Sequence, residues 1–279
     1  MTSHLVSTDW LAEHLQDADL LIIDCRKSKP GVTPPIDFHG KYLDKHIPGA
    51  LYIEVDSISD CTTGLPHMLP TAEEFATSMS QRGISQDQHI VVYDEGDLFS
   101  APRVWWMLTR FGAKNVQILD GGLNAWIAED KTTQSGEITR AAATFNAALD
   151  NAVVVSAEQV QDAIGKVQII DARSLGRFKG ELPEPRAGLH GGHIPGSLSV
   201  PFTEITDNGH VKSADALKAT FERLGVDITQ PTIASCGSGV TAAALLFALE
   251  SLGAKDVLIY DGSWAEWGDI NKNYPIEKG

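Results

Sequence analysis

The stretch "HIPGALYIEVDSI", residues 46–58, occurs a second time in altered form as "HIPGSLSVPFTEI", residues 193–205. Two further pairs of segments repeat in the same order: "LLIIDCR" (20–26) with "VQIIDAR" (167–173), and "FGAKNVQILDGGLNAW" (111–126) with "LGAKDVLIYDGSWAEW" (252–267). The first pair is offset by 147 residues (46 to 193) and the last by 141 (111 to 252). Such a period is too long for a solenoid repeat and indicates a duplicated domain.

Each copy contains short apolar runs separated by stretches with a helical pattern. The runs are "LLIID", "LYI", "HIVVYD" and "VQILD" in the first copy, and "VQIID", "LSVPF", "TIASC" and "VLIYD" in the second. Nearly continuous apolar strands that alternate with helices are typical of a parallel sheet covered on both faces. We therefore predict an α/β fold of two tandem domains, each a mainly parallel sheet flanked by helices.

A polar region without a clear period, Ala128 to Asn151, lies between the two copies. It has the composition of a connecting segment. We predict an N-terminal domain over residues 1–135, a linker over 136–151 and a C-terminal domain over 152–279.

The composition limits the classes of partner. The 279 residues carry a net charge of −15, which repels phosphate backbones and anionic lipid, so neither nucleic acid nor a membrane is expected as a partner. The N-terminus lacks a basic segment followed by an apolar run, and we predict a cytoplasmic protein. The three cysteines, Cys25, Cys61 and Cys236, are too few and too irregularly spaced for a disulfide framework or a zinc site. No metal or other cofactor is expected.

The two copies differ at the end of one strand. "VVYDEGDLFSAPRVWWML" (91–108) corresponds to "IASCGSGVTAAALLFAL" (233–249), so Asp94 stands where Cys236 stands. A carboxylate cannot do thiol chemistry, and only the second copy can use a cysteine at this position. Ligands of parallel α/β sheets bind beyond the carboxyl ends of the strands, which is where this cysteine is expected.

The residues after Cys236 have the composition of an anion-binding loop. Glycines permit positive φ, and the start of a helix leaves backbone N–H groups unpaired, so the loop can turn several N–H groups toward its centre. Such a loop favours a thiolate and can also hold a sulfur anion one atom further out. The predicted loop consists of Gly237, Ser238, Gly239, Val240 and Thr241. Without these neighbours, Cys236 would be read as a small buried residue.

At this point the chain resembles the tandem-domain rhodanese family, in particular its 3-mercaptopyruvate sulfurtransferases. The resemblance covers both HIPG blocks and the segments "PHMLP" (66–70), "VVYDEG" (91–96), "GRFKGELPEPR" (176–186), "CGSGVTA" (236–242) and "YDGSWAEWG" (260–268). It implies that the thiolate of Cys236 attacks the sulfur of 3-mercaptopyruvate, releases pyruvate and becomes a persulfide. A thiol acceptor such as thioredoxin, or cyanide in vitro, then takes the outer sulfur.

The resemblance also implies roles for further residues. Arg177 and Arg186 match arginines that bind the substrate, and a guanidinium binds a carboxylate better than an ammonium group does. Ser238, His67 and Asp56 match a serine, a histidine and an aspartate that are proposed to act together in proton transfer. Read without the resemblance, the arginines are solvated surface residues, Asp56 is a loop cap and His67 is an ordinary surface histidine.

Three other functions are considered. A cysteine phosphatase needs an arginine where Ala242 stands, so phosphatase activity is not expected. A non-catalytic interaction module suits the first copy but not the second, which has the cysteine loop. The third alternative is the same persulfide chemistry with thiosulfate as donor. The corresponding sulfurtransferases typically have a charged pair after the cysteine, where Gly237 and Ser238 are neutral, and this difference favours mercaptopyruvate.

Overall fold

The computed structural model describes residues 4–149 and 153–279. The chain divides into two compact units. The first comprises Met1–Ser59, Leu69–Asp150 and Asn208–Val211, and the second comprises Asp60–Met68, Asn151–Asp207 and Lys212–Gly279. Two short segments thus belong to the unit other than the one their place in the sequence suggests. The predicted domain limits at residue 1 and at residues 151 and 152 lie outside the described residues.

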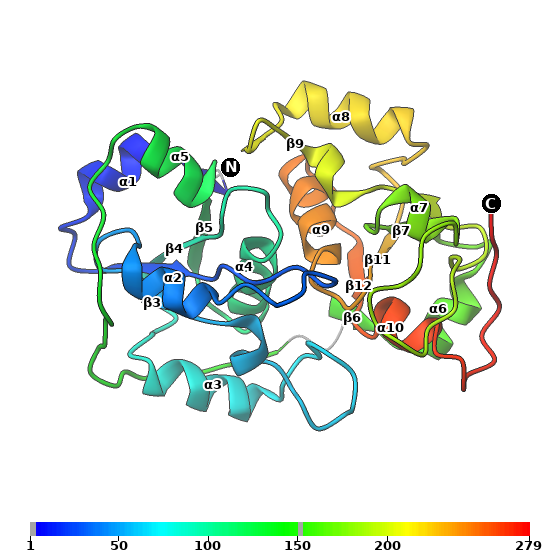
Figure 1. Cartoon of the computed structure of the whole chain (residues 1–279), viewed down its shortest axis with the longest axis horizontal. Coiled ribbons are helices and arrows are strands. Elements are labelled where there is room, and N and C mark those ends of the chain that lie inside the picture. The colour runs from blue at the N-terminus through cyan, green and yellow to red at the C-terminus, as the bar shows by residue number, and fades with distance from the viewer. Residues whose placement is uncertain (1–3, 150–152) are drawn as a thin grey trace. The chain divides into compact units, whose positions relative to one another are not determined.

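The first unit contains a five-stranded parallel sheet in the order β1-β5-β4-β2-β3. Figure 1 labels β3, β4 and β5 of this sheet. Its strands are β1 (Leu5–Val6), β2 (Leu20–Asp24), β3 (Leu51–Tyr52), β4 (His89–Tyr93) and β5 (Asn115–Leu119). Its helices are α1 (Thr8–His14), α2 (Phe38–Asp44), α3 (Ala72–Gln81), α4 (Ala101–Arg110) and α5 (Gly122–Ala128), with a 3-10 turn, η1, at Val55–Ile58.

The second unit repeats this topology with a five-stranded parallel sheet in the order β6-β12-β11-β7-β8. Its strands are β6 (Val154–Val155), β7 (Gln168–Asp171), β8 (Leu198–Ser199), β11 (Thr232–Ser235) and β12 (Val257–Tyr260). Its helices are α6 (Ala157–Ala163), α7 (Leu175–Phe178), α8 (Ala214–Arg223), α9 (Ala242–Ser251) and α10 (Ser263–Trp267), with a 3-10 turn, η3, at Phe202–Ile205. Two short strands follow that turn in the sequence: β9 (Thr206–Asp207) belongs to the second unit and β10 (His210–Val211) to the first.

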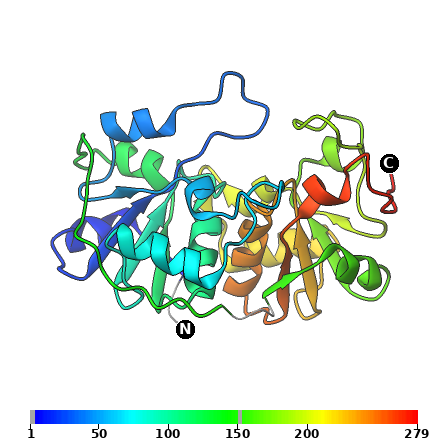
Figure 2. The ribbon, with the colours of Figure 1, turned by 90° about the horizontal axis from the view of Figure 1, so that it is seen from below.

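Period-two alternation explains how both faces of these sheets are covered. In β2, Leu20 and Ile22 pack with Leu11 of α1 and Trp126 of α5, while the buried Leu21 and Ile23 alternate with them and so point to the opposite face. The second sheet is likewise covered, with α9 on one side and α6 and α10 on the other (Figure 2). The predicted α/β fold with two tandem parallel-sheet domains is confirmed.

The central strands β4 and β11 end at equivalent points, and each is followed by a loop and a helix. In the first unit the loop holds its own carboxylate: Asp94 accepts hydrogen bonds from the N–H groups of Gly96 (2.8 Å), Ser100 (3.0 Å) and Ala101 (3.0 Å). The first loop therefore holds the carboxylate of Asp94 at the position where the second loop has a thiol.

Over the described residues, no helix has both the length and the apolar composition needed to span a membrane.

Candidate active site

Cys236 follows β11 directly and is buried, with 1% of its surface exposed. Two backbone hydrogen bonds fix the chain just after its side chain: the Trp264 N–H donates to the Cys236 carbonyl (2.9 Å) and the Ala265 N–H to the Gly237 carbonyl (3.0 Å). The equivalent bond in the first unit runs from the Leu123 N–H to the Asp94 carbonyl (3.0 Å). Both copies therefore attach this loop to the strand–helix junction after the neighbouring strand, β12 or β5, in the same way.

The loop after Cys236 uses its two glycines differently. Gly239 has φ of 78°, the left-handed region that favours glycine. Gly237 does not have positive φ, but a Cβ there would stand 3.0 Å from Nη2 of Arg177. The Ser238 N–H reaches the Cys236 sulfur, at 3.4 Å. The sequence predicted that several N–H groups of this loop turn toward its centre, and this stays a prediction.

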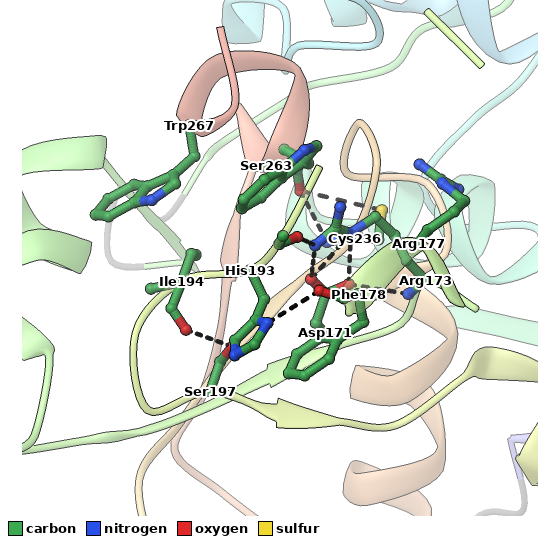
Figure 3. Close-up of polar contacts among 12 residues, drawn as sticks. Asp171, Arg173, Arg177, Phe178, His193, Ile194, Ser197, Cys236, Ser263 and Trp267 are labelled. Carbon is green, nitrogen blue, oxygen red and sulfur yellow. Dashed lines mark hydrogen bonds and ion pairs between the residues drawn. The ribbon is translucent and has the colours of Figure 1, made fainter. Parts of the chain in front are cut away.

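Ser263 is a residue of this site that sequence reasoning missed. It is fully buried, and its Oγ accepts hydrogen bonds from the N–H groups of Cys236 and Gly239, each at 3.1 Å. The hydroxyl donates to the Tyr260 carbonyl (2.8 Å) and lies 4.0 Å from the Cys236 sulfur (Figure 3). Its φ is 49°, where the first unit has Gly122 at 55°. A non-glycine residue in this region is strained, and this one is held by its side chain. The two repeats differ at this position: "LDGG" (119–122) ends in Gly122, whereas "YDGS" (260–263) ends in Ser263, and this difference could have indicated the residue.

The Ser263→Ala variant is expected to lose about 2 kcal/mol of unfolding free energy, because two buried N–H groups lose their acceptor. Persulfide formation on Cys236 is expected to slow as the loop loosens. Denaturant unfolding and single-turnover loading measure the two effects. Ser251→Ala removes an exposed hydroxyl, bonded to the Phe247 carbonyl at 2.8 Å near the end of α9, and serves as the control. Equal stability of the two variants would contradict the role of Ser263.

His67 contacts the same loop. It lies in the segment Asp60–Met68, which belongs to the second unit and is closed at its base by the Asp60 N–H donating to the Met68 carbonyl (2.8 Å). Its ring Nδ1 lies 3.0 Å from Oγ of Ser238 and 3.3 Å from the Ser238 carbonyl oxygen. The carbonyl only accepts, so a hydrogen assigned to Nδ1 serves both contacts and does not use the Ser238 hydroxyl hydrogen. His67 is buried and has φ of 61°, another strained residue next to the cysteine loop.

Asp56 belongs to the first unit, in the 3-10 turn Val55–Ile58. Lys27 Nζ lies 2.5 Å from its carboxylate, whose side chain is 47% exposed. Of the three residues that the resemblance groups together, the structure brings His67 and Ser238 into contact within one unit.

Arg177 lies on α7, and its guanidinium is held against the cysteine loop at Gly237. Figure 3 shows Arg177 beside Cys236. Its Nη2 and Nε donate to the carboxylate of Glu184, at 2.6 Å and at 3.2–3.3 Å. Arg186, two residues after Glu184 in the same loop, is partly buried. The structure therefore holds Arg177, a predicted substrate-binding residue, directly against the cysteine loop.

A buried ion-pair network lies behind Arg177. Arg173 donates to Asp171 (2.6 Å) and to Glu184 (2.8 Å), and its guanidinium stacks on the Trp264 ring at 4.1 Å. Burial alone would lower the pKa of Arg173, but the two facing carboxylates outweigh it and raise that pKa, so Arg173 stays charged. Within this network, two arginines and two carboxylates cancel formally.

The histidines of the two HIPG blocks have structural hydrogen bonds. His46 Nδ1 lies 2.7 Å from the Tyr42 carbonyl, and His193 Nδ1 lies 2.9 Å from the Phe178 carbonyl. Within the described part of the chain, no group of three or more histidine, cysteine or acidic side chains is arranged to hold a metal ion.

Comparison with known proteins identifies the fold family. The sequence matches the rhodanese-like domain over residues 7–129 and again over 156–269. The chain belongs to the rhodanese family. The resemblance predicted from the repeated blocks and the cysteine loop is thereby confirmed, and this rhodanese has two copies of the domain.

Several relatives align over nearly the whole rhodanese chain. The 3-mercaptopyruvate sulfurtransferase of Escherichia coli K12 is 47% identical over 99% of this chain and 98% of the relative. The thiosulfate sulfurtransferase of Bos taurus is 40% identical over 94% and 91%. Among solved structures, the 3-mercaptopyruvate sulfotransferase SseA from Escherichia coli superposes with a TM-score of 0.87 at 46% identity, covering 95% of this chain and all of that one.

Proposed function

We propose that the protein transfers the sulfur of 3-mercaptopyruvate to a thiol or to cyanide through a persulfide on Cys236, with release of pyruvate. The observation that carries the proposal is the guanidinium of Arg177 held at Gly237, the residue after Cys236. The thiol of Cys236 and the guanidinium of Arg177 at the next residue fit a donor that has both a sulfur and a carboxylate. The name and 47% identity of the Escherichia coli relative support the same donor.

The reaction consists of two half-reactions. The thiolate of Cys236 attacks the substrate sulfur, the carbon–sulfur bond breaks, and its electron pair goes to carbon to give the enolate of pyruvate. Protonation of that carbon gives pyruvate, and the cysteine keeps the sulfur as a persulfide. The acceptor thiolate, or cyanide, then attacks the outer sulfur and restores the Cys236 thiolate, so ping-pong kinetics are expected.

Roles follow for the surrounding residues. The loop Gly237–Thr241 holds the persulfide, with the Ser238 N–H already on the Cys236 sulfur. Arg177 and Arg186 bind the carboxylate and the ketone oxygen of the substrate. Ser238, paired with His67, supplies or removes a proton at the substrate, and we keep Asp56 as the third member of this group.

The cellular setting is also proposed. The thiol acceptor is a protein such as thioredoxin, the location is the cytoplasm, and neither nucleic acid nor a membrane takes part. The domain limits at 135/136 and 151/152 stay a proposal as well.

Thiosulfate is the alternative donor, and the 40% identity to the bovine thiosulfate sulfurtransferase is the reason to test it. Thiosulfate is a dianion, and it needs more positive charge than a loop with neutral Gly237 and Ser238 provides. Glu184 offsets much of the charge of Arg177, which also favours the singly charged carboxylate of mercaptopyruvate.

With cyanide as acceptor, thiocyanate is expected to form at least about tenfold faster from mercaptopyruvate than from thiosulfate at equal concentration, a difference of roughly 1.4 kcal/mol. Pyruvate should appear in step with thiocyanate in the first case. Faster turnover of thiosulfate would replace the proposed donor with the alternative.

A further inference from the structure

Glu184 is a buried carboxylate shared by two arginines. One of its oxygens accepts from Nη1 of Arg173 at 2.8 Å and the other from Nη2 of Arg177 at 2.6 Å. Its side chain is 2% exposed, against 0% for Arg173 and 22% for Arg177. A buried carboxylate needs partners for both oxygens, and here the partners are two guanidinium groups. Of the two arginines, Arg177 is the one whose side chain is partly exposed to solvent.

The backbone around Glu184 is restricted by its neighbours Pro183 and Pro185. Each proline fixes its own φ, and Pro185 also excludes the helical region for Glu184. The carboxylate is therefore presented from a stiff segment, although this segment lies outside helices and strands.

The orientation of Arg177 follows from this contact. Glu184 accepts from the Nε and Nη2 edge of the guanidinium. The Nη2 atom lies 3.0 Å, and Nη1 3.8 Å, from the position of a Cβ on Gly237, so the group is held against the loop. Within the described residues, Nη1 has no hydrogen bond to protein, so its two N–H groups, together with the second N–H of Nη2, remain for a ligand.

The first repeat provides an internal comparison. There Arg26 corresponds to Arg173, and its Nη1 pairs with Glu95 at 3.3 Å. Glu95 is the residue after Asp94 and so corresponds to Gly237. In the second repeat the carboxylate that pairs with this arginine comes from Glu184, beside α7. A glutamate at position 237 could also have paired with Arg173, but its side chain would occupy the space that Arg177 takes at Gly237.

We propose that Glu184 is a positioning residue that fixes Arg177 against the cysteine loop so that its Nη1 edge binds the carboxylate of the sulfur donor. The inference rests on the proposed function of Arg177. It assigns Glu184 to the first half-reaction, loading of Cys236, because the acceptor that discharges the persulfide need not have a carboxylate.

The test uses the Glu184→Gln variant of the full chain. Glutamine keeps one acceptor oxygen and so can bond only one of the two arginines. Its amide N–H groups face the N–H groups of the other guanidinium, and we expect the more exposed Arg177 to shift away. Single-turnover loading from 3-mercaptopyruvate should fall about tenfold, the order of effect expected for a misplaced binding group. Discharge of the preformed persulfide by dithiothreitol should stay unchanged. Glu181→Gln, an exposed carboxylate of the same loop, is the matched control.

A double-mutant cycle separates positioning from general damage. In an Arg177→Ala background, Glu184→Gln should change loading by less than about twofold, since its effect acts through Arg177. Equal slowing of loading and discharge by Glu184→Gln, or the same loss with and without Arg177, would overturn the inference. If Glu184→Gln fails to fold, Glu184→Asp keeps the charge, reaches only one arginine, and is measured in the same way.

The cycle also distinguishes this inference from the proposed function. Normal loading of Arg177→Ala would remove Arg177 from substrate binding, and the role of Glu184 would fall with it. Slow loading of Arg177→Ala together with normal loading of Glu184→Gln would reject the positioning role alone and leave the proposed function intact.

Discussion

Brief exposure of the Cys236→Ser variant to 3-mercaptopyruvate without acceptor is expected to leave its intact mass unchanged, whereas the native chain gains one sulfur atom. A serine hydroxyl at this position stays protonated and is a poor nucleophile toward sulfur. Turnover with cyanide should fall at least about a thousandfold, as expected when the nucleophile of a covalent mechanism is removed. Intact mass spectrometry and a thiocyanate assay measure the two effects.

The other two cysteines make this prediction specific. Cys25 is fully buried and its thiol donates to the Tyr93 carbonyl at 3.1 Å. Burial raises the pKa of the Cys25 thiol well above its ordinary value, and the negative charges of Asp94 and Asp24 raise it further, so this thiol stays protonated at neutral pH. Cys61 is exposed, and Cys61→Ser is the matched control, expected to load one sulfur as the native chain does. A persulfide that survives Cys236→Ser would place the nucleophile elsewhere.

The sheets were predictable because their central strands carry their own signal. The strands ending at Asp24, Tyr93, Asp171 and Ser235 are four or five residues long, have an apolar centre and recur in both copies. All four edge strands have only two residues, too few for any periodicity. The strands β3 and β8 were found because they lie in the repeated HIPG blocks, whereas β1 and β6 lie outside the repeated blocks and were missed. Their places are fixed by pairing with β5 and β12, a long-range contact.

The site was predictable where one residue type carries the chemistry. Cys236 stood out because the equivalent residue of the first repeat is Asp94. Ser263 and Glu184 did not stand out in the sequence. The role of Ser263 depends on contacts with residues 24 or more positions away, and the role of Glu184 depends on the direction of its side chain. For His67, the strained φ and the contact with Ser238 are properties of the folded chain that no local pattern contains.

Arg177→Ala is expected to have the second largest effect. A charge-assisted contact to a substrate carboxylate contributes about 2 kcal/mol, so kcat/KM for mercaptopyruvate should fall roughly thirtyfold. Arg186→Ala should lower it by a similar factor if this arginine binds the other end of the donor. Steady-state kinetics with pyruvate detection measure both. Arg223→Ala removes an exposed arginine of the same unit, paired with Glu204 at 2.6 Å, and should leave kcat/KM unchanged.

The structure indicates why the loss should appear in catalysis more than in folding. Without Arg177, Glu184 still has Arg173 as a partner at 2.8 Å, so no buried carboxylate is left without a cation. A melting temperature close to that of the native chain is therefore expected alongside the kinetic loss. Arg177→Lys should recover only part of the activity, because an ammonium group cannot bond Glu184 with one edge and a carboxylate with the other. Full activity of Arg177→Lys would mean that charge alone, without the guanidinium fork, is what the cysteine loop requires from α7.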